Sequence, residues 1–375
     1  MLPQPSVWLT LAAFVCLLGP LVFFHEFGHY FVARLFGIPA ETFSIGFGHE
    51  LFGWTDRQGT RWKVAWLPLG GYVKFVGDMS VASEPGELDD IPEHLRERVF
   101  QVQPVWQRFL VVFAGPAANF ILAVLIFAAF YSLVGTPLTN VVGDVVPKSA
   151  AAQAGIQPGD RIMAVAGQST PTFEDISRVV LLRPNEKVSL EIERSGVRHR
   201  LEVKLGSAMV ESITDRKMRA GSLGIHSTTV VGKPVSVLRA VPMAVDKTAR
   251  TTRAIADGFV QLIRGQVSPK QLGGPITIAR VAGKGAELGF LPFIGLLALL
   301  SINLGFINLL PVPMLDGGHL FFYVIEAVRR RPLSAGALEL AFRGGLALVF
   351  ALMVFLTIND LGSLGLWDRL QRLIG

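Results

Sequence analysis

The sequence predicts an α-helical polytopic membrane protein with about four transmembrane helices, a membrane-associated β-hairpin and an inserted α+β domain. Its 375 residues are 51% hydrophobic and only 17% charged, whereas a soluble domain carries about 25% charged residues. The mean hydropathy is +0.47. The apolar residues gather in long uncharged stretches, and about 20 such residues suffice for a helix to cross a bilayer. These observations exclude a purely soluble enzyme.

Four uncharged stretches locate the membrane spans. They are Leu2–Phe24, Phe109–Gly143, Leu288–Leu315 and Leu346–Asn359. With their flanks they predict spans at about 7–36, 104–134, 289–310 and 338–358, followed by a tail at 359–375. No Lys or Arg precedes the first stretch, so we expect residues 1–36 to contain a retained span and not a cleavable signal peptide.

The distribution of basic residues predicts the orientation. Cytoplasmic loops are enriched in Lys and Arg, and both loop 37–103 and loop 317–337 carry such clusters. We therefore expect these loops in the cytoplasm, with both termini and the long loop between the second and third spans on the outer side.

The net charge of +6 is interpreted as attraction to the lipid bilayer and not as nucleic-acid binding, because basic and aromatic residues do not cluster. A single cysteine, Cys16, excludes an intramolecular disulfide.

The loops between the spans contain further predicted elements. In loop 37–103, Gly70-Gly71 separates two strand-like runs of Trp62–Phe75, which predicts a β-hairpin there, and the acidic stretch Glu84–Glu97 predicts a solvated surface. Residues 140–206 read as a compact α+β module. Its predicted elements are a strand at Arg161–Val165, a helix at Pro171–Leu182, and strands at Val188–Glu193 and Arg200–Leu205 joined at Ser195-Gly196. Residues 207–288 form an amphipathic region, within which Pro234–Arg264 has apolar residues at helical spacing and is expected to lie along the membrane surface.

The motif His25-Glu26-Phe27-Gly28-His29 carries the strongest chemical signal in the chain. Histidines four residues apart lie on one face of a helix, so both imidazoles can bind one metal ion, and the glutamate can reach a water on that ion. Ionisable groups at the end of an apolar span are costly and usually functional. A polar cluster without a metal, just outside the membrane, is the alternative interpretation.

A catalytic zinc ion needs a third protein ligand and an open position. Asp316 follows the third uncharged stretch, and Pro311 and Pro313 break the helix before it, which can turn the carboxylate back toward the histidines. A cap or turn role for Asp316 is the alternative. His319 is a second candidate ligand, although a histidine at the start of a helix is more often structural.

These motifs resemble those of the site-2 protease family of intramembrane zinc metalloproteases. The resemblance is carried by HEFGH at 25–29 and NLLPVPMLDGG at 308–318, and by Gly70–Phe75, Phe113–Phe120 and Leu272–Ile276. Within the family the chain is similar to the bacterial regulator of sigma-E protease, whose outer loop carries PDZ modules. The outer loop here has room for one such module, at 140–206.

The resemblance implies one catalytic zinc ion bound by His25, His29 and Asp316, with Glu26 as the catalytic base and Asn308 as a substrate-binding residue. It implies location in the bacterial inner membrane, with the active site toward the cytoplasm and the PDZ module in the periplasm. The implied substrate is a membrane-spanning protein of the anti-sigma-factor type, already trimmed by another protease.

Cleavage within a membrane also sets a physical requirement on the substrate. The carbonyls of a helix are engaged in hydrogen bonds, so the substrate must unwind, and a sheet edge can take the unwound segment as an added strand. The candidates for that edge contain Gly46, Gly48, Gly70 and Gly71.

Three other functions compete with this interpretation. A metalloprotease that degrades signal-peptide remnants at the membrane surface fits the same motif. A transporter would show paired, similar halves, which are not found in this sequence, and a non-catalytic PDZ scaffold has no need of HExxH. The outer module itself either recognises or filters substrates, or has only a passive packing role.

Overall fold

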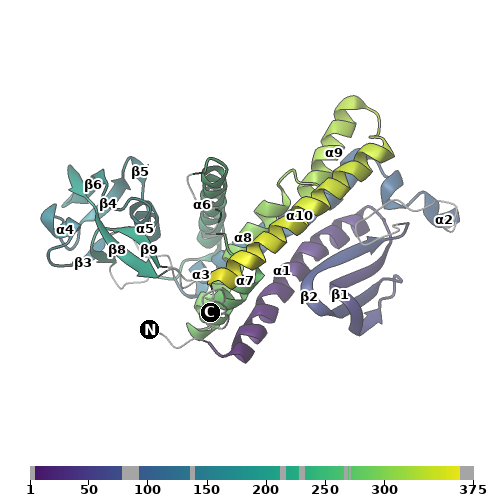
Figure 1. Ribbon diagram of the computed structural model, residues 1–375, viewed down its shortest axis with the longest axis horizontal. Coiled ribbons are helices and arrows are strands. Elements are labelled where there is room, and N and C mark those ends of the chain that lie inside the picture. The colour runs from purple at the N-terminus through teal and green to yellow at the C-terminus, as the bar shows by residue number, and fades with distance from the viewer. Residues whose placement is uncertain are drawn as a thin grey trace, which may run out of the picture. The chain divides into compact units, whose positions relative to one another are not determined.

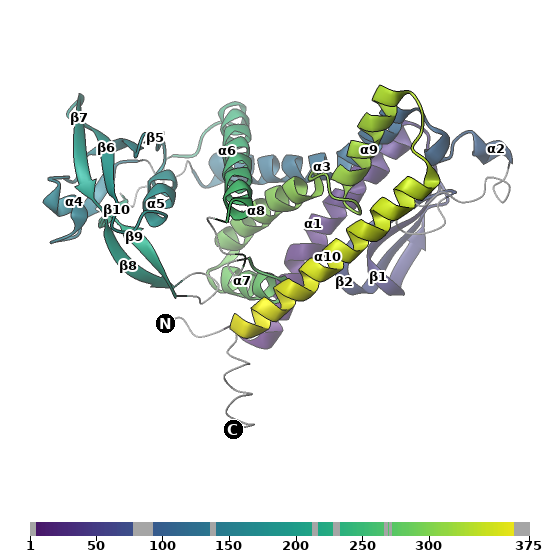
Figure 2. The same cartoon turned by 45° about the horizontal axis from the view of Figure 1, so that its top comes forward.

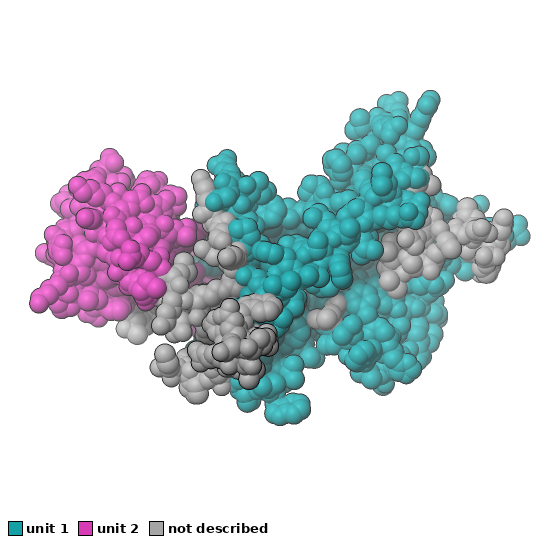
Figure 3. Space-filling model, viewed as in Figure 1, with its two compact units in different colours: residues 1–127, 243–375 teal, residues 128–242 magenta. Residues whose placement is uncertain are grey.

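The computed structural model describes residues 5–77, 93–135, 140–211, 217–227, 233–265, 269 and 272–363. The chain divides into two compact units, and Figure 3 colours them separately. The first comprises residues 1–127 and 243–375, and the second comprises residues 128–242. Most of the predicted acidic stretch Glu84–Glu97 and of the C-terminal tail lies outside the described residues.

Four long apolar helices confirm the predicted membrane spans (Figure 1). They are α1 (Val7–Leu35), α3 (Val105–Leu133), α8 (Phe290–Asn308) and α10 (Ala335–Ser363). Within the described part of the chain, these are the helices long and apolar enough to cross a membrane. Each differs from its predicted span by no more than a few residues at either end. The chain is therefore a polytopic membrane protein.

The first span begins and packs in ways that follow from its sequence. Ser6 caps α1 by accepting a hydrogen bond from the amide of Leu9 at 3.2 Å. Gly28 lets α3 approach closely, because a Cβ at that position would lie 2.3 Å from the carbonyl oxygen of Ala114. The same helix buries Leu17 and Leu21 against residues of α3, α8 and the amphipathic helix α7 (Pro275–Glu287). One face of α1 is thus fixed by neighbouring helices.

The β-hairpin turns at a different place from the predicted one. Strands β1 (Ala40–Thr55) and β2 (Arg61–Phe75) are joined at 56–60, and Gly70-Gly71 lies inside β2. Asp56 makes the turn, because its carboxylate accepts from the amides of Gln58 at 2.8 Å and Thr60 at 3.0 Å. The prediction of a turn at Gly70-Gly71 is wrong because those glycines allow a bend within a strand.

Both strands are bent, so that the first half of β1 lies between the two halves of β2. Residues 42–45 pair with 61–64 on one side and with 71–74 on the other. The bend requires Gly46 and Gly48, which have φ values of +91° and +87°; a Cβ on Gly46 would lie 2.8 Å from the carbonyl oxygen of Leu67. In the described structure the second half of β2 pairs with β1 on one side only. It is therefore an edge.

Residues 317–337, which the sequence predicts as a loop, contain a helix. Helix α9 runs over Asp316–Arg329 and begins directly after the turn that contains Pro311 and Pro313. The cluster Arg329-Arg330-Arg331 marks its end, where Arg330 has φ +55°. Two further short helices, α2 (Glu93–Arg96) and η2 (Phe100–Val102), precede α3. The prediction concerned only the place of this segment between two spans and its charge, and the helix lies within that segment.

The end of α10 caps α7, a helix distant in sequence, and Figure 2 shows α7 beside the ends of α1 and α10. Asp360 is 1% exposed. Its carboxylate accepts from the amides of Gly274 at 3.0 Å and Thr277 at 2.9 Å, and from the Thr277 hydroxyl at 2.6 Å. At the other end of α7, a Cβ on Gly283 would lie 2.7 Å from Thr10 Oγ1 of α1. Helix α7 therefore ties the start of α1 to the end of α10.

The second unit is an α+β domain built on an antiparallel sheet of order β5-β4-β6-β7. Its strands are β4 (Arg161–Val165), β5 (Gln168–Ser169), β6 (Lys187–Arg194) and β7 (Val197–Lys204), with helices α4 (Ala150–Gln153) and α5 (Phe173–Leu181). Ser195 and Gly196 have φ values of +52° and +79°, which suit a two-residue hairpin turn. The predicted strand–turn–strand and the short helix are present.

The second unit extends beyond the predicted boundary at residue 206. Strands β8 (Gly206–Glu211) and β9 (Lys217–Ser222) form a hairpin, and β10 (Ile225–Ser227) pairs with β3 (Val142–Val145). The amphipathic helix predicted for this region is α6 (Val237–Ile263), which begins only after these strands. The pairing of β10 with β3 joins segments about 80 residues apart, and local periodicity cannot reveal it.

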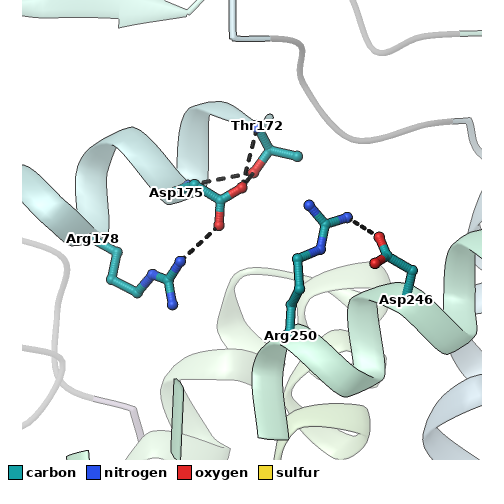
Figure 4. Close-up of polar contacts among 5 residues, drawn as sticks. All are labelled: Thr172, Asp175, Arg178, Asp246 and Arg250. Carbon is teal, nitrogen blue, oxygen red and sulfur yellow. Dashed lines mark hydrogen bonds and ion pairs between the residues drawn. The ribbon is translucent and has the colours of Figure 1, made fainter. Parts of the chain in front are cut away.

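Local ion pairs stabilise two of these helices (Figure 4). Thr172 and Asp175 form a reciprocal capping box at the start of α5, and Arg178 pairs with Asp175 at 3.0 Å. In α6, Arg250 pairs with Asp246 one turn earlier. Such exposed pairs contribute only a few tenths of a kcal/mol each, about 0.2–0.5.

Candidate metal centre

Three side chains from two helices converge in the first unit. Helix α1 presents His25 and His29 one turn apart, and the turn after α8 brings Asp316, the first residue of α9, to face them. His25 Nε2 lies 3.2 Å from Asp316 Oδ2, His29 Nε2 lies 3.5 Å from Asp316 Oδ1, and the two Nε2 atoms are 3.4 Å apart. The structure therefore places Asp316 beside the two histidines of the motif.

The hydrogen bonds around this cluster leave acceptor atoms facing one another, and a bound cation would stabilise them. His29 Nδ1 lies 2.9 Å from the carbonyl oxygen of Val111, which can only accept, so Nδ1 carries a proton and the neutral ring has its lone pair on Nε2. That lone pair faces the Asp316 carboxylate. Acceptor atoms so close repel one another unless a positive charge lies between them.

The spacing of the three donor atoms fits zinc. Two imidazole nitrogens and a carboxylate oxygen, with a fourth position open, are a donor set of catalytic zinc sites. Ligand atoms about 2.0–2.1 Å from a tetrahedral ion lie about 3.3 Å from one another. The two Nε2 atoms are 3.4 Å apart, and each lies at a similar distance from one carboxylate oxygen of Asp316, 3.2 Å from Oδ2 for His25 and 3.5 Å from Oδ1 for His29.

A pocket of about 240 Å³ opens beside the three donors. Glu26 lines it, and so do Gly71, Tyr72 and Val73 of the β2 edge. Gly71 is required for this approach, because a Cβ there would lie 3.0 Å from Glu26 Cγ and 2.6 Å from the carbonyl oxygen of Ser44. The pocket thus places a carboxylate, a strand edge and the three donors around one space.

The other predicted site residues divide into two groups. Asn308 lines the pocket, with its Nδ2 atom 3.4 Å from His25 Nε2. Gly46, Gly48 and Gly70 are not among the lining residues; all three have positive φ and serve the bend of the hairpin. Of the predicted glycines, only Gly71 is placed at the site.

His319 also lines the pocket but is not part of the three-residue cluster. Burial lowers its pKa, which favours the neutral imidazole. Its ring packs against Phe342 of α10, with the centroids 5.0 Å apart. The structure therefore favours Asp316 over His319 as the third donor.

Helix α3 makes contacts at the site that the sequence interpretation did not assign. A Cβ on Gly115 would lie 2.2 Å from His29 Nε2, so only glycine lets the imidazole lie against the helix. Asn119 is fully buried and contacts His25. Both residues belong to the Phe113–Phe120 motif, to which the sequence assigns no role beyond the family resemblance. Their partners are too distant in sequence for spacing to reveal them.

Comparison with known proteins gives the class to which this fold and site belong. The profile of peptidase family M50 matches residues 13–352. The chain is 43% identical over 362 residues to a provisionally named zinc metalloprotease of Brucella suis, covering 94% of this chain and 95% of the relative. A similar protein of Agrobacterium fabrum is 43% identical over 358 residues, covering 94% and 95%. Metalloprotease MmpA of Caulobacter vibrioides is 38% identical over 379 residues, covering 94% and 95%.

A membrane protein with paired histidines and an aspartate at one pocket is thus matched along nearly its whole length by metalloproteases. The chain belongs to peptidase family M50, the site-2 protease family. It is a zinc metalloprotease.

Proposed function

We propose that the protein is an intramembrane endopeptidase that cleaves the transmembrane segments of single-span proteins during regulated proteolysis. The observation that carries the proposal is the position of the donor cluster: His25 and His29 lie within α1, a helix long and apolar enough to span the bilayer. A site built into a span is suited to a peptide bond that itself lies within the membrane.

In the proposed mechanism, His25, His29 and Asp316 hold the zinc ion and Glu26 acts as the base. When bound, zinc supplies a Lewis acid that polarises the scissile carbonyl and acidifies water. Glu26, in the same pocket, takes the proton of the attacking water and delivers it to the leaving amine nitrogen. Asn308 is proposed to hold the substrate backbone, since its amide lies beside His25 at the pocket wall.

The substrate is proposed to bind as an added strand. A helical segment shields its peptide bonds, and unwinding leaves amides and carbonyls that need partners. The edge of β2 at Gly71, Tyr72 and Val73 offers such partners, and these residues already line the pocket. Strand addition would therefore place the unwound segment beside Glu26.

The second unit is proposed to be a PDZ-type module on the periplasmic face of the bacterial inner membrane. We propose that it filters substrates by size, so that a membrane protein of the anti-sigma-factor type is admitted after another protease has removed its outer part. Support comes from its α+β fold and from the length of chain that separates the second and third spans. The basic clusters in loop 37–103 and near Arg330 support an active site toward the cytoplasm.

The experiment that tests the proposal replaces the base. Purified protein and its Glu26→Gln variant are compared, in detergent and in proteoliposomes, on a single-span substrate. We expect the variant to bind one zinc ion per chain but to lose cleavage by at least about 100-fold, since an amide cannot take a proton from water.

Two results would contradict the proposal. Substantial cleavage by a zinc-loaded Glu26→Gln variant would remove Glu26 as the base. Wild-type cuts that fall only outside the transmembrane segment, as mass spectrometry of the products would report, would place the protease at the membrane surface.

A further inference from the structure

One face of α3 contacts both histidines of the donor cluster. Val111, Gly115 and Asn119 are spaced four residues apart and so lie on one side of the helix. The carbonyl of Val111 accepts from His29, and Gly115 leaves room for the His29 ring. The side chain of Asn119 reaches the other histidine, His25. Helix α3 thus supplies the second partner of each imidazole.

The Asn119 side chain is buried where it meets His25. The residue is 0% exposed, and its Nδ2 atom lies 3.2 Å from His25 Nδ1. Its backbone carbonyl accepts a hydrogen bond of 2.8 Å from the hydroxyl of Ser301 in α8, which is also 0% exposed. Among the described residues, Asn119 Oδ1 is buried without a hydrogen-bond partner. No second contact of the amide therefore decides which of its two ends faces His25.

The direction of the hydrogen bond decides whether His25 can bind a metal. The two orientations of an amide fill the same space, and only its partners distinguish them. With Nδ2 toward His25, the ring accepts at Nδ1 and carries its proton on Nε2, the atom 3.2 Å from Asp316 Oδ2. With Oδ1 toward His25, the ring donates from Nδ1 and leaves a lone pair on Nε2. Only the second arrangement leaves a ligand atom in the cluster.

We propose that Asn119 is a positioning residue that accepts a hydrogen bond from His25 Nδ1–H through Oδ1 and so keeps Nε2 free to bind zinc. The inference rests on the proposed function, because it takes His25 as a zinc ligand. It gives the histidines matching partners on one helix: a backbone carbonyl for His29 and a side-chain carbonyl for His25. Such outer partners set the tautomer and orientation of a ligating histidine.

The test compares four variants with the wild-type protein. Asn119→Leu keeps the volume but removes the acceptor, and Asn119→Asp restores an acceptor oxygen. His25→Ala removes the proposed ligand, and Ser132→Ala, which deletes another hydrogen-bonding group from α3, is the matched control. The measurements on purified protein are the zinc dissociation constant, by competition with a chelator, and the thermal unfolding midpoint with and without zinc.

We expect Asn119→Leu to weaken zinc binding by about 10–100-fold, the usual cost of losing an outer partner of a metal ligand. Asn119→Asp and Ser132→Ala should bind zinc within a few-fold of wild type. The zinc-induced rise in the unfolding midpoint should shrink in Asn119→Leu, while the midpoint of the metal-free protein stays close to wild type. Asn119→Ala, which also lacks the acceptor, replaces the Leu variant if that variant does not fold.

Wild-type zinc affinity in the variants without an acceptor would overturn the inference. So would an Asp variant that binds as weakly as the Leu variant, because the defect would then follow from the loss of the amide and not of the acceptor. His25→Ala separates this failure from that of the proposed function. If that variant keeps its zinc, the ligand assignment is wrong; if it loses zinc while Asn119→Leu does not, only the role of Asn119 is wrong.

Discussion

Three glycines determine how closely the protein backbone approaches the metal-binding side chains. A Cβ would lie 2.3 Å from the Ala114 carbonyl oxygen at Gly28, 3.0 Å from Glu26 Cγ at Gly71, and 2.2 Å from His29 Nε2 at Gly115. Real Cβ atoms essentially never lie within 3.0 Å of such atoms, so a side chain at Gly28 or Gly115 would force a shift, and one at Gly71 would press tightly on Glu26. The geometry of the site therefore depends on glycine at these three positions as much as on the residues proposed to bind zinc.

Gly115→Ala tests this point. The added methyl group would displace the His29 ring or move α3, so we expect zinc affinity to fall by about 10-fold or more. Overpacking should also lower the free energy of unfolding by about 1–3 kcal/mol. Gly19→Ala is the control, because a Cβ on Gly19 of α1 has no atom within 4 Å. Zinc titration and thermal unfolding measure both effects, and equal behaviour of the two variants would contradict the packing argument.

Asp316→Ala tests the third ligand. We expect zinc affinity to fall by at least about 100-fold and proteolysis to be lost, because two imidazoles alone hold the ion weakly. His319→Ala should keep zinc near one ion per chain, since His319 lies outside the cluster of three donors. Metal content after dialysis measures both. Retention of zinc by Asp316→Ala, with its loss from His319→Ala, would exchange the two assignments.

At the scale of elements, an ion pair in the second unit links the start of β4 to the end of the neighbouring strand β6. Asp160, directly before β4, is 1% exposed and accepts two hydrogen bonds of 2.7 Å from Arg194 at the end of β6. It also accepts from the amide of Gln157 at 2.8 Å. Burial raises the pKa of Asp160, but these hydrogen bonds and the Arg194 charge lower it more, so the pKa lies below its ordinary value.

This depressed pKa predicts how the stability of the second unit depends on pH. The pair contributes its full stability above the unfolded pKa of about 3.9, and the contribution is lost as pH falls through the lower folded pKa. Asp160→Asn should lower stability at pH 7 by about 2 kcal/mol, the value of hydrogen bonds to a charged group, and remove this acid dependence. Hydrogen exchange of the β4 and β6 amides in the intact protein, corrected for intrinsic rates, measures it. An unchanged pH dependence in the variant would contradict the assignment.

At the scale of the whole molecule, the first unit has two distinct ends. Helix α7 contacts the start of α1 through Gly283 and the end of α10 through Gly274 and Thr277. At the other end, Arg108 at the start of α3 pairs with Glu326 of α9 at 2.7 Å. The hairpin packs against Tyr30 and Ala33, near the end of α1. Both regions that the charge pattern assigns to the cytoplasm therefore lie at one end of the helices.

Cysteine labelling tests the orientation of these ends. In a background in which Cys16 is replaced by Ser, single cysteines are introduced at the exposed positions Arg57, Arg198 and Arg331. In spheroplasts we expect a membrane-impermeant maleimide to label Arg198→Cys and not the other two, because loops rich in Lys and Arg stay in the cytoplasm. Detergent should make all three reactive. The reverse pattern would invert the topology.

Local sequence signals predicted part of this architecture. The four spans, the i, i+4 histidines and the Ser195-Gly196 turn depend on residues close together in the chain. Asp316 is predictable as a candidate ligand because prolines end the preceding helix, but the sequence does not distinguish this role from that of a cap or turn residue. The roles of Gly115 and Asn119 depend on contacts across about 90 residues, and the pairing of β10 with β3 on contacts across about 80. No periodicity carries such information, because it arises only when helices and strands pack.

The capping of α7 by Asp360 has a consequence for biosynthesis. During translation α7 emerges before α10, and the cap for its first turn lies 86 residues beyond Gly274. Until the last span is inserted, the first amides of α7 have no carboxylate to bind, and α10 itself is largely exposed along its length. The capping of α7 must therefore wait until the last span has been made. A truncated product that ends before Asp360 would lack the carboxylate that accepts from the amides of Gly274 and Thr277, so the first turn of α7 would lose its cap.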